Sequence, residues 1–171
     1  MSLPRQALDP SRTPWHITWG TYGTRLHGSV RPTVEREHNK RGEAFVPANA
    51  QREQAIRKIL NFPPVVFTGV QREFIEAALP AVCERGGWTY RIAAAAGDHV
   101  HILCDIVPAI HGEKVRRLLK RWLGEALSTE WPLPAKATWW AEEGSNLAVK
   151  DEAYLNNVYR YIAKQRATVV K

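Results

Sequence analysis

The chain has 171 residues, of which 44% are hydrophobic and 24% are charged, and such a composition is typical of one soluble globular domain. The formal net charge of +7 favours a polyanionic partner such as nucleic acid. There is no run of about 18 apolar residues and no apolar signal segment near the start, so we expect no membrane span and a cytoplasmic location. Cys83 and Cys104 are expected to be reduced core residues.

Seven tryptophans and five tyrosines accompany the excess of cations. Proteins bind single-stranded nucleic acid with aromatic rings on which bases stack and with cations that contact phosphates. Most large aromatic side chains are nevertheless buried in a core, so composition alone leaves an inert basic surface open as an alternative.

In chain order, residues 1–14 contain three prolines and predict a flexible N-terminal tail. Residues 15–22 alternate in character and predict a strand with one buried face. Residues 24–68 form a long insertion, within which residues 49–60 predict a short basic helix. The role of this insertion is left open, because loops of more than about 12–15 residues are usually functional or mobile.

Thr68 and Gln71 have the spacing of a capping box, and a helix follows that Gly86 and Gly87 end. Periodicity and turn residues then predict two strands, a helix, a strand and a last helix, over residues 88–96, 97–107, 109–128, 138–149 and 151–166, although residues 138–149 also fit a small hairpin around Gly144. The order βαββαβ predicts an α+β ferredoxin-like sandwich, with an antiparallel sheet and an added C-terminal helix. We therefore expect one domain over residues 15–171.

His99 and His101 are separated by one residue in a predicted strand. Alternate residues of a strand project to the same side, so both imidazoles face one way and Val100 faces the other. Two neutral imidazoles so placed are able to bind one divalent cation, although two polar residues on a solvated strand give the same pattern. Asp98 precedes the pair, and a turn role is favoured for it over the orientation of an imidazole.

Tyr161 and Gln165 lie four residues apart in the last predicted helix, and so on one face of it. A tyrosine hydroxyl is a weak nucleophile, and a metal ion that polarises the attacked phosphate compensates for this. Tyr154 and Tyr159 lie on the same helix without a glutamine four residues later, so Tyr161 is the first candidate. An ordinary packing role for Tyr161 is the alternative.

The sequence HVH on a strand, a basic helix after it, and Y-I-x-x-Q on a C-terminal helix together resemble the single-tyrosine HUH transposases of insertion sequences. The similarity is greatest to the branch of REP-associated tyrosine transposases, whose first strand the segment WHITWGTYGTRLHG also resembles. The resemblance extends over about residues 15–166.

This resemblance implies that His99, His101 and Gln165 hold Mg²⁺ or Mn²⁺ and that Tyr161 attacks a DNA phosphate. The products would be a 5′-phosphotyrosine link and a free 3′-OH, and rejoining would reverse the step. It implies single-stranded DNA with hairpins as the partner. It also implies a monomer or a homodimer, in which the tyrosine serves its own histidines or those of the other subunit. A ligand set without cysteine suits Mg²⁺ or Mn²⁺ better than structural zinc.

A cationic stripe is predicted in the helix over residues 109–128, because Lys114, Arg117 and Arg121 recur at spacings of three and four. These cations are candidate DNA contacts, and a merely solvated stripe explains them equally well. Three further histidines are expected to be surface residues or phosphate contacts rather than metal ligands, namely His16, His27 and His38.

A non-catalytic, domesticated nucleic-acid-binding module with the same fold is the alternative function. The intact set of His99, His101, Tyr161 and Gln165 favours the enzyme. An RNA-binding domain of ferredoxin-like fold is less favoured, because the central strand carries histidines in place of the aromatic residues on which RNA bases stack.

Overall fold

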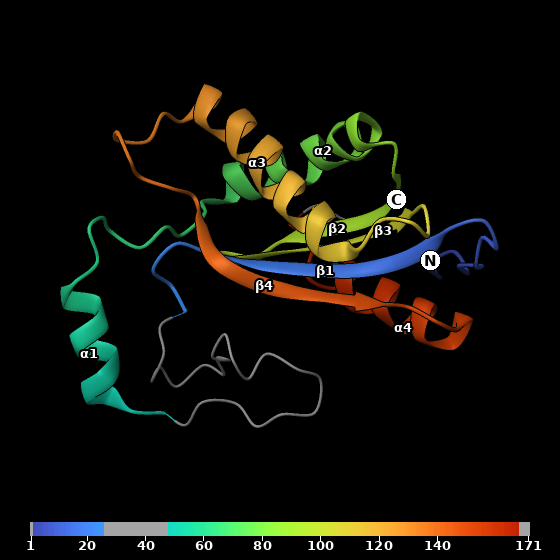
Figure 1. Ribbon diagram of the computed structural model, residues 1–171, viewed down its shortest axis with the longest axis horizontal. Helices are drawn as coiled ribbons and strands as arrows, with labels where there is room; N and C mark the ends of the chain where they lie inside the picture. The colour runs from blue at the N-terminus through green and yellow to red at the C-terminus, as the bar shows by residue number, and fades with distance from the viewer. Residues whose placement is uncertain (1, 26–47, 168–171) are drawn as a thin grey trace.

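The computed structural model describes residues 2–25 and 48–167, which contain four strands and four helices (Figure 1). In chain order the elements are β1 Thr13–Thr21, α1 Ala50–Lys58, α2 Gly69–Gly86, β2 Thr89–Ala95, β3 His99–Ile106, α3 Gly112–Glu130, β4 Trp140–Ala148 and α4 Glu152–Ala163. Each element overlaps a segment that the sequence predicts, and the differences are confined to the ends. None of the described helices is long and apolar enough to cross a membrane.

The four strands form one antiparallel sheet in the order β2-β3-β1-β4. Helices α2 and α3 cover one face of this sheet, and α4 lies on the other face (Figure 1). Without α1 and α4 the element order is βαββαβ, and with this strand order it is the ferredoxin-like α+β sandwich that the sequence predicts. The predicted fold class is therefore confirmed, with α4 as the added helix.

Two apolar cores lie on the two faces of the sheet, because successive residues of a strand point in opposite directions. The core beneath α2 and α3 includes, from the central strands, Ile17, Trp19, Val100 and Ile102. The core beneath α4 includes Ile92, Ala94, Leu103, Leu155 and Ile162. The alternation that sends Val100 and Ile102 to the first core sends His99 and His101 to the α4 side of the sheet.

The capping box predicted for α2 is present, because the Gln71 amide donates to Thr68 Oγ1 and the Thr68 amide donates to Gln71 Oε1. Gly87 ends α2 in the left-handed region, with φ of 70°, a conformation that glycine adopts at little cost. Pro80 lies within the helix, which continues through it.

Strand β4 packs closely on β1 where Gly144 pairs with Trp19. A Cβ at position 144 would lie 2.8 Å from Cδ of Arg116 and closer still to the backbone carbonyl of Thr18. Arg116, on α3, is itself buried and donates to Asn146 Oδ1 on β4 at 2.9 Å. Glycine at position 144 is therefore what allows β4, β1 and α3 to meet at this point.

The N-terminal segment packs against α4 instead of forming the flexible tail that its prolines suggest. The Gln6 amide donates to Asn156 Oδ1, and Asn156 Nδ2 donates back to the Gln6 carbonyl, both at 2.9 Å. Leu3 and Leu8 pack on the core beneath α4. The expectation fails because these residues find apolar and hydrogen-bonding partners about 150 positions away in the chain.

Of the long insertion, the structure describes the last part, which includes α1. Asn49 caps this helix by accepting from the Arg52 amide, as a helix over residues 49–60 requires. The chain then returns to the sheet, where the Val65 amide donates to the Tyr22 carbonyl at 2.9 Å. Residues 26–47, with His27 and His38, lie outside the described residues.

Candidate active site

The side chains of His99 and His101 lie next to each other on the α4 side of β3. Their ring centroids are 4.7 Å apart and the rings are nearly perpendicular. His101 lies deep in the structure, with 6% of its surface exposed. The two imidazoles therefore project to the same side of β3, as the alternation of a strand predicts.

His101 Nδ1 contacts two side chains of the neighbouring strand β1. It lies 2.8 Å from Thr18 Oγ1 and 3.1 Å from His16 Nε2, and these two atoms are 3.4 Å from each other. His101 Nε2 is buried and has no hydrogen-bond partner among the described residues. One ring nitrogen of His101 is thus doubly contacted and the other is available.

His16 therefore belongs to this site, although the sequence favours a surface position for it. The signal that could have found it is the alternation of β1, which turns His16 and Thr18 away from the apolar side chains of Ile17 and Trp19. The missing information is the register, because only the pairing of Thr18 with His101 places these residues together.

His99 has a different set of neighbours. Its Nδ1 lies 2.6 Å from a carboxylate oxygen of Asp98 and 3.1 Å from Nη2 of Arg25. The carboxylate of Asp98 also lies 3.9 Å from Nε of Arg25. Asp98 serves the turn as well, because its backbone carbonyl accepts from the Thr21 amide at 2.9 Å. A carboxylate at Nδ1 orients an imidazole and leaves Nε2 as its available nitrogen.

Burial makes the central histidines neutral. It lowers the pKa of His16 to about 4. It also lowers the pKa of His101 to about 3, and the neighbouring His99, His16 and Arg25 contribute to this second shift. A neutral imidazole is the form in which histidine binds a metal ion, so at neutral pH no proton has to leave these two rings first.

Tyr161 lies against the histidines from the side of α4. Its ring centroid is 5.4 Å from that of His101 and 6.3 Å from that of His16, in edge-on arrangements. Half of the Tyr161 surface is exposed. By contrast, Tyr159 is 7% exposed within the core beneath α4, and Tyr154 packs at the edge of that core. Of the three tyrosines of this helix, Tyr161 is thus the one beside the histidines.

Gln165 follows the end of α4, because the helix ends at Ala163 rather than near residue 166 as predicted. Its amide nitrogen Nε2 is buried and lacks a hydrogen-bond partner among the described residues. A side-chain amide presents either its oxygen or its nitrogen after a half-turn about its last bond. Gln165 therefore offers a buried polar group one turn beyond Tyr161.

Side chains of α2 hold the segment after α4 and so end the helix early. Oε1 of Glu76 accepts from the Ala95 amide at 3.1 Å and from the Ala167 amide at 2.8 Å. Arg72 donates to the carbonyls of Ala95 and Gln165, at 2.6 and 3.4 Å. Because the backbone of this segment bonds to side chains of α2, it does not continue the helical hydrogen bonds that the sequence pattern predicts.

The residues at hand fit the expected metal ligands by their chemistry. His101 Nε2 and the Gln165 amide are buried polar groups that lack partners among the described residues, and His99 is engaged through Nδ1. Two imidazoles and an amide oxygen suit a divalent cation such as Mg²⁺ or Mn²⁺. Across residues 2–25 and 48–167, no three His, Cys, Asp or Glu side chains are arranged to hold a metal.

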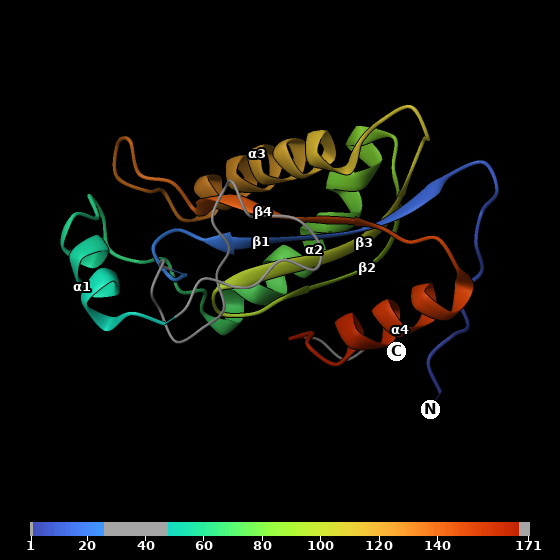
Figure 2. The same ribbon diagram turned by 60° about the horizontal axis from the view of Figure 1, so that its bottom comes forward.

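The predicted cationic stripe lies on α3, which covers the opposite face of the sheet (Figure 2). Lys114, Arg117 and Arg121 are all exposed, and Arg121 pairs with Glu125 at 3.1 Å. The structure therefore does not bring this stripe together with the histidines. Lys120 on the same helix is turned inward, and its Nζ donates to two carbonyls of β4.

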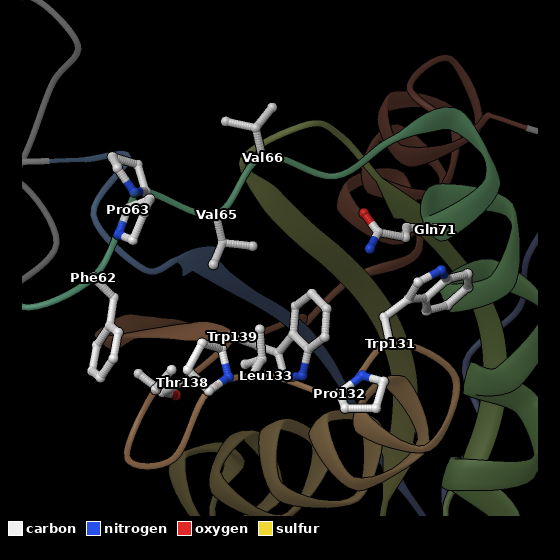
Figure 3. Close-up of a pocket in the computed structure, with 13 residues that line it drawn as sticks. Phe62, Pro63, Val65, Val66, Gln71, Trp131, Pro132, Leu133, Thr138 and Trp139 are labelled. Carbon is white, nitrogen blue, oxygen red and sulfur yellow. The ribbon is translucent and has the colours of Figure 1, made fainter.

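A cavity of about 400 Å³ lies away from the histidines. The segment over residues 62–66 lines one side of it and the segment over residues 131–139 lines the other (Figure 3). Its walls are mostly proline, valine and aromatic side chains, with Gln71 and Thr138 as polar groups. None of the residues that line this cavity belongs to the site that contains Tyr161.

Comparison of the sequence with protein-family profiles and with curated proteins gives no match. Among solved structures, the chain is similar to a "putative transposase" from Deinococcus radiodurans R1. The two share 15% sequence identity and a TM-score of 0.51, over 98% of this chain and 100% of the other. At this identity the likeness shows a common fold.

Proposed function

We propose that this protein cleaves and rejoins single-stranded DNA through a covalent link to Tyr161, as a metal-dependent transposase. The observation that carries the proposal is the position of Tyr161, half exposed and edge-on to His101 at 5.4 Å. Support comes from the available nitrogen of His101, from the net charge of +7, and from the common fold with a protein described as a transposase.

In the proposed reaction, His99, His101 and the side-chain amide of Gln165 would hold the cation. When bound, the cation supplies polarisation of a phosphate oxygen. The hydroxyl oxygen of Tyr161 forms a bond to phosphorus and loses its proton. The bond from phosphorus to the 3′ oxygen of the preceding nucleotide breaks, and that oxygen takes up a proton. Because the phosphodiester is exchanged and not hydrolysed, the reverse step rejoins the strand without an external energy source.

The proposed reaction takes place within one chain. The ring of Tyr161 contacts the histidine of its own sheet, and Glu76 and Arg72 fix the segment after α4 to the same body. The stripe of Lys114, Arg117 and Arg121 would contact phosphates on the opposite side of the sheet. Hairpin-bearing DNA would reach both places only by passing around an edge of the sheet.

The test is incubation with single-stranded hairpin DNA and Mn²⁺, followed by a denaturing gel that detects covalent protein–DNA adducts. The wild type should form the adduct. Tyr161→Phe, which removes only the hydroxyl, should bind the DNA normally and form no adduct at any Mn²⁺ concentration. Tyr154→Phe is the matched control on the same helix and should behave as the wild type.

His99→Ala should also reduce the adduct, but excess Mn²⁺ should restore part of it, because this change weakens the metal and leaves the nucleophile. An adduct that persists in Tyr161→Phe and disappears in Tyr154→Phe would move the nucleophile to Tyr154. A wild type that binds hairpin DNA and never forms an adduct would establish the non-catalytic binding module instead.

A further inference from the structure

Three polar atoms of the central strands meet beside the proposed metal site. They are His101 Nδ1 on β3 and, on β1, Thr18 Oγ1 and His16 Nε2, with separations of 2.8, 3.1 and 3.4 Å. The antiparallel register sets Thr18 directly opposite His101, and His16 lies two residues away on the same face. β1 therefore delivers two side chains to one nitrogen of His101.

A neutral imidazole carries one N–H, and its position decides what the ring can do. With the proton on Nδ1, His101 donates to Thr18 Oγ1 and His16 Nε2, and its Nε2 keeps a lone pair. With the proton on Nε2, that N–H would be buried without an acceptor among the described residues, an arrangement that proteins avoid because of its cost. The lack of an acceptor at Nε2 favours the Nδ1–H tautomer, and Thr18 Oγ1 and His16 Nε2 are placed to accept from that N–H.

We propose that His16 and Thr18 are positioning residues that hold His101 in the Nδ1–H tautomer, with its Nε2 lone pair available to a divalent cation. This inference rests on the proposed function, because it concerns a ligand of the same site. Asp98 stands at the corresponding nitrogen of His99, so the two histidines are oriented by different groups: a carboxylate for His99, and a hydroxyl with a second imidazole for His101.

The direct test is a two-bond proton–nitrogen NMR spectrum of the metal-free protein with isotope-labelled histidine, which shows which ring nitrogen carries the proton. We expect His101 to be the Nδ1–H tautomer in the wild type. An Nε2–H tautomer in the wild type would overturn the proposal without the need for any variant.

Variants of His16 and Thr18 test whether these two side chains determine the tautomer of His101. The double change His16→Phe with Thr18→Val keeps the shape of both side chains approximately and removes both acceptors, so we expect the Nε2–H tautomer to appear. Mn²⁺ affinity, measured by calorimetry, should fall by about 10–100-fold. Thr18→Ser keeps the hydroxyl and should retain both properties. Thr13→Val, at the other end of β1, is the matched control and should leave both unchanged.

A folded double variant with the wild-type tautomer and wild-type Mn²⁺ affinity would refute the positioning role. If the double variant does not fold, Thr18→Val against Thr18→Ser makes the same comparison with a smaller change. The proposed function is tested separately. A wild type that has the Nδ1–H tautomer and binds Mn²⁺ but forms no DNA adduct would support this inference and exclude the proposed transposase function.

Discussion

On the α2 and α3 side of the sheet, β1 and β3 contribute Ile17, Trp19, Val100 and Ile102, none of them more than 1% exposed. On the α4 side the same stretches of the same strands contribute His16, Thr18, His99 and His101. Two helices cover the first side, whereas on the second side Tyr161 of the single helix α4 is half exposed. The comparison teaches that, within these stretches of β1 and β3, one alternating pattern supplies an apolar core with one set of residues and the candidate site with the other.

The largest expected contrast is between neighbours on β3. Ile102→Ala should lower the free energy of unfolding by about 2–5 kcal/mol and leave Mn²⁺ affinity unchanged. His101→Ala should lower Mn²⁺ affinity by at least about 10-fold, because it removes a ligand. Urea unfolding and calorimetric titration measure the two effects. If the Ile102→Ala variant bound Mn²⁺ as weakly as the His101→Ala variant, the two faces of β3 would not have separate roles in stability and metal binding.

Glu76 connects the two sides at the edge of the sheet, since it lies on α2 and binds the segment after α4 while being 2% exposed. Glu76→Gln should lower the free energy of unfolding by about 1–3 kcal/mol, because charge-assisted bonds to two backbone amides are weakened. Hydrogen exchange at the Ala167 amide should become faster. Glu73→Gln, an exposed change on the same helix, should do neither; equal effects of both would exclude a specific role for Glu76.

The histidines His16 and His101 on the α4 side should make the free energy of unfolding depend on pH. Because the pKa values of His16 and His101 fall from 6.5 to about 4 and about 3, the unfolded chain binds protons near pH 5 that the native protein excludes. Stability should therefore decrease as the pH falls from 6.5 toward 4, by up to about 1.4 kcal/mol per pH unit for each excluded proton. Urea unfolding of the metal-free protein measures the slope. His16→Phe should reduce it, and an unchanged slope would contradict the assignment.

The smallest effect is expected on the outer surface of α3. If Lys114, Arg117 and Arg121 contact phosphates, their joint replacement by alanine should reduce the slope of log affinity against log salt by about three. Arg117→Lys with Arg121→Lys keeps the charge and should leave the slope unchanged. An alanine variant with the wild-type slope would place the DNA contacts on other cations and leave α3 a solvated face.

Local sequence patterns predict much of this structure. The capping box of Thr68 and Gln71, the alternation of β1 and the spacing of His99 and His101 all depend on residues within a few positions of one another, so the sequence predicts them. The contact of His16 with His101 joins positions 85 residues apart, and the register that creates it is a property of the assembled sheet. The early end of α4 and the packing of Gln6 on Asn156 have the same origin, since tertiary partners override the local signal.

Gly144 has a consequence for how freely this chain can vary. An exposed edge strand usually accepts alanine in place of glycine with little loss, yet here the added methyl group would meet Arg116 and the carbonyl of Thr18. Relief of that overlap would displace the backbone of Thr18, which carries the hydroxyl beside His101. The smallest possible addition to an outer strand is thereby transmitted to the histidines across the sheet. Among natural variants of this protein, position 144 should drift far less than its place at the margin of the sheet suggests.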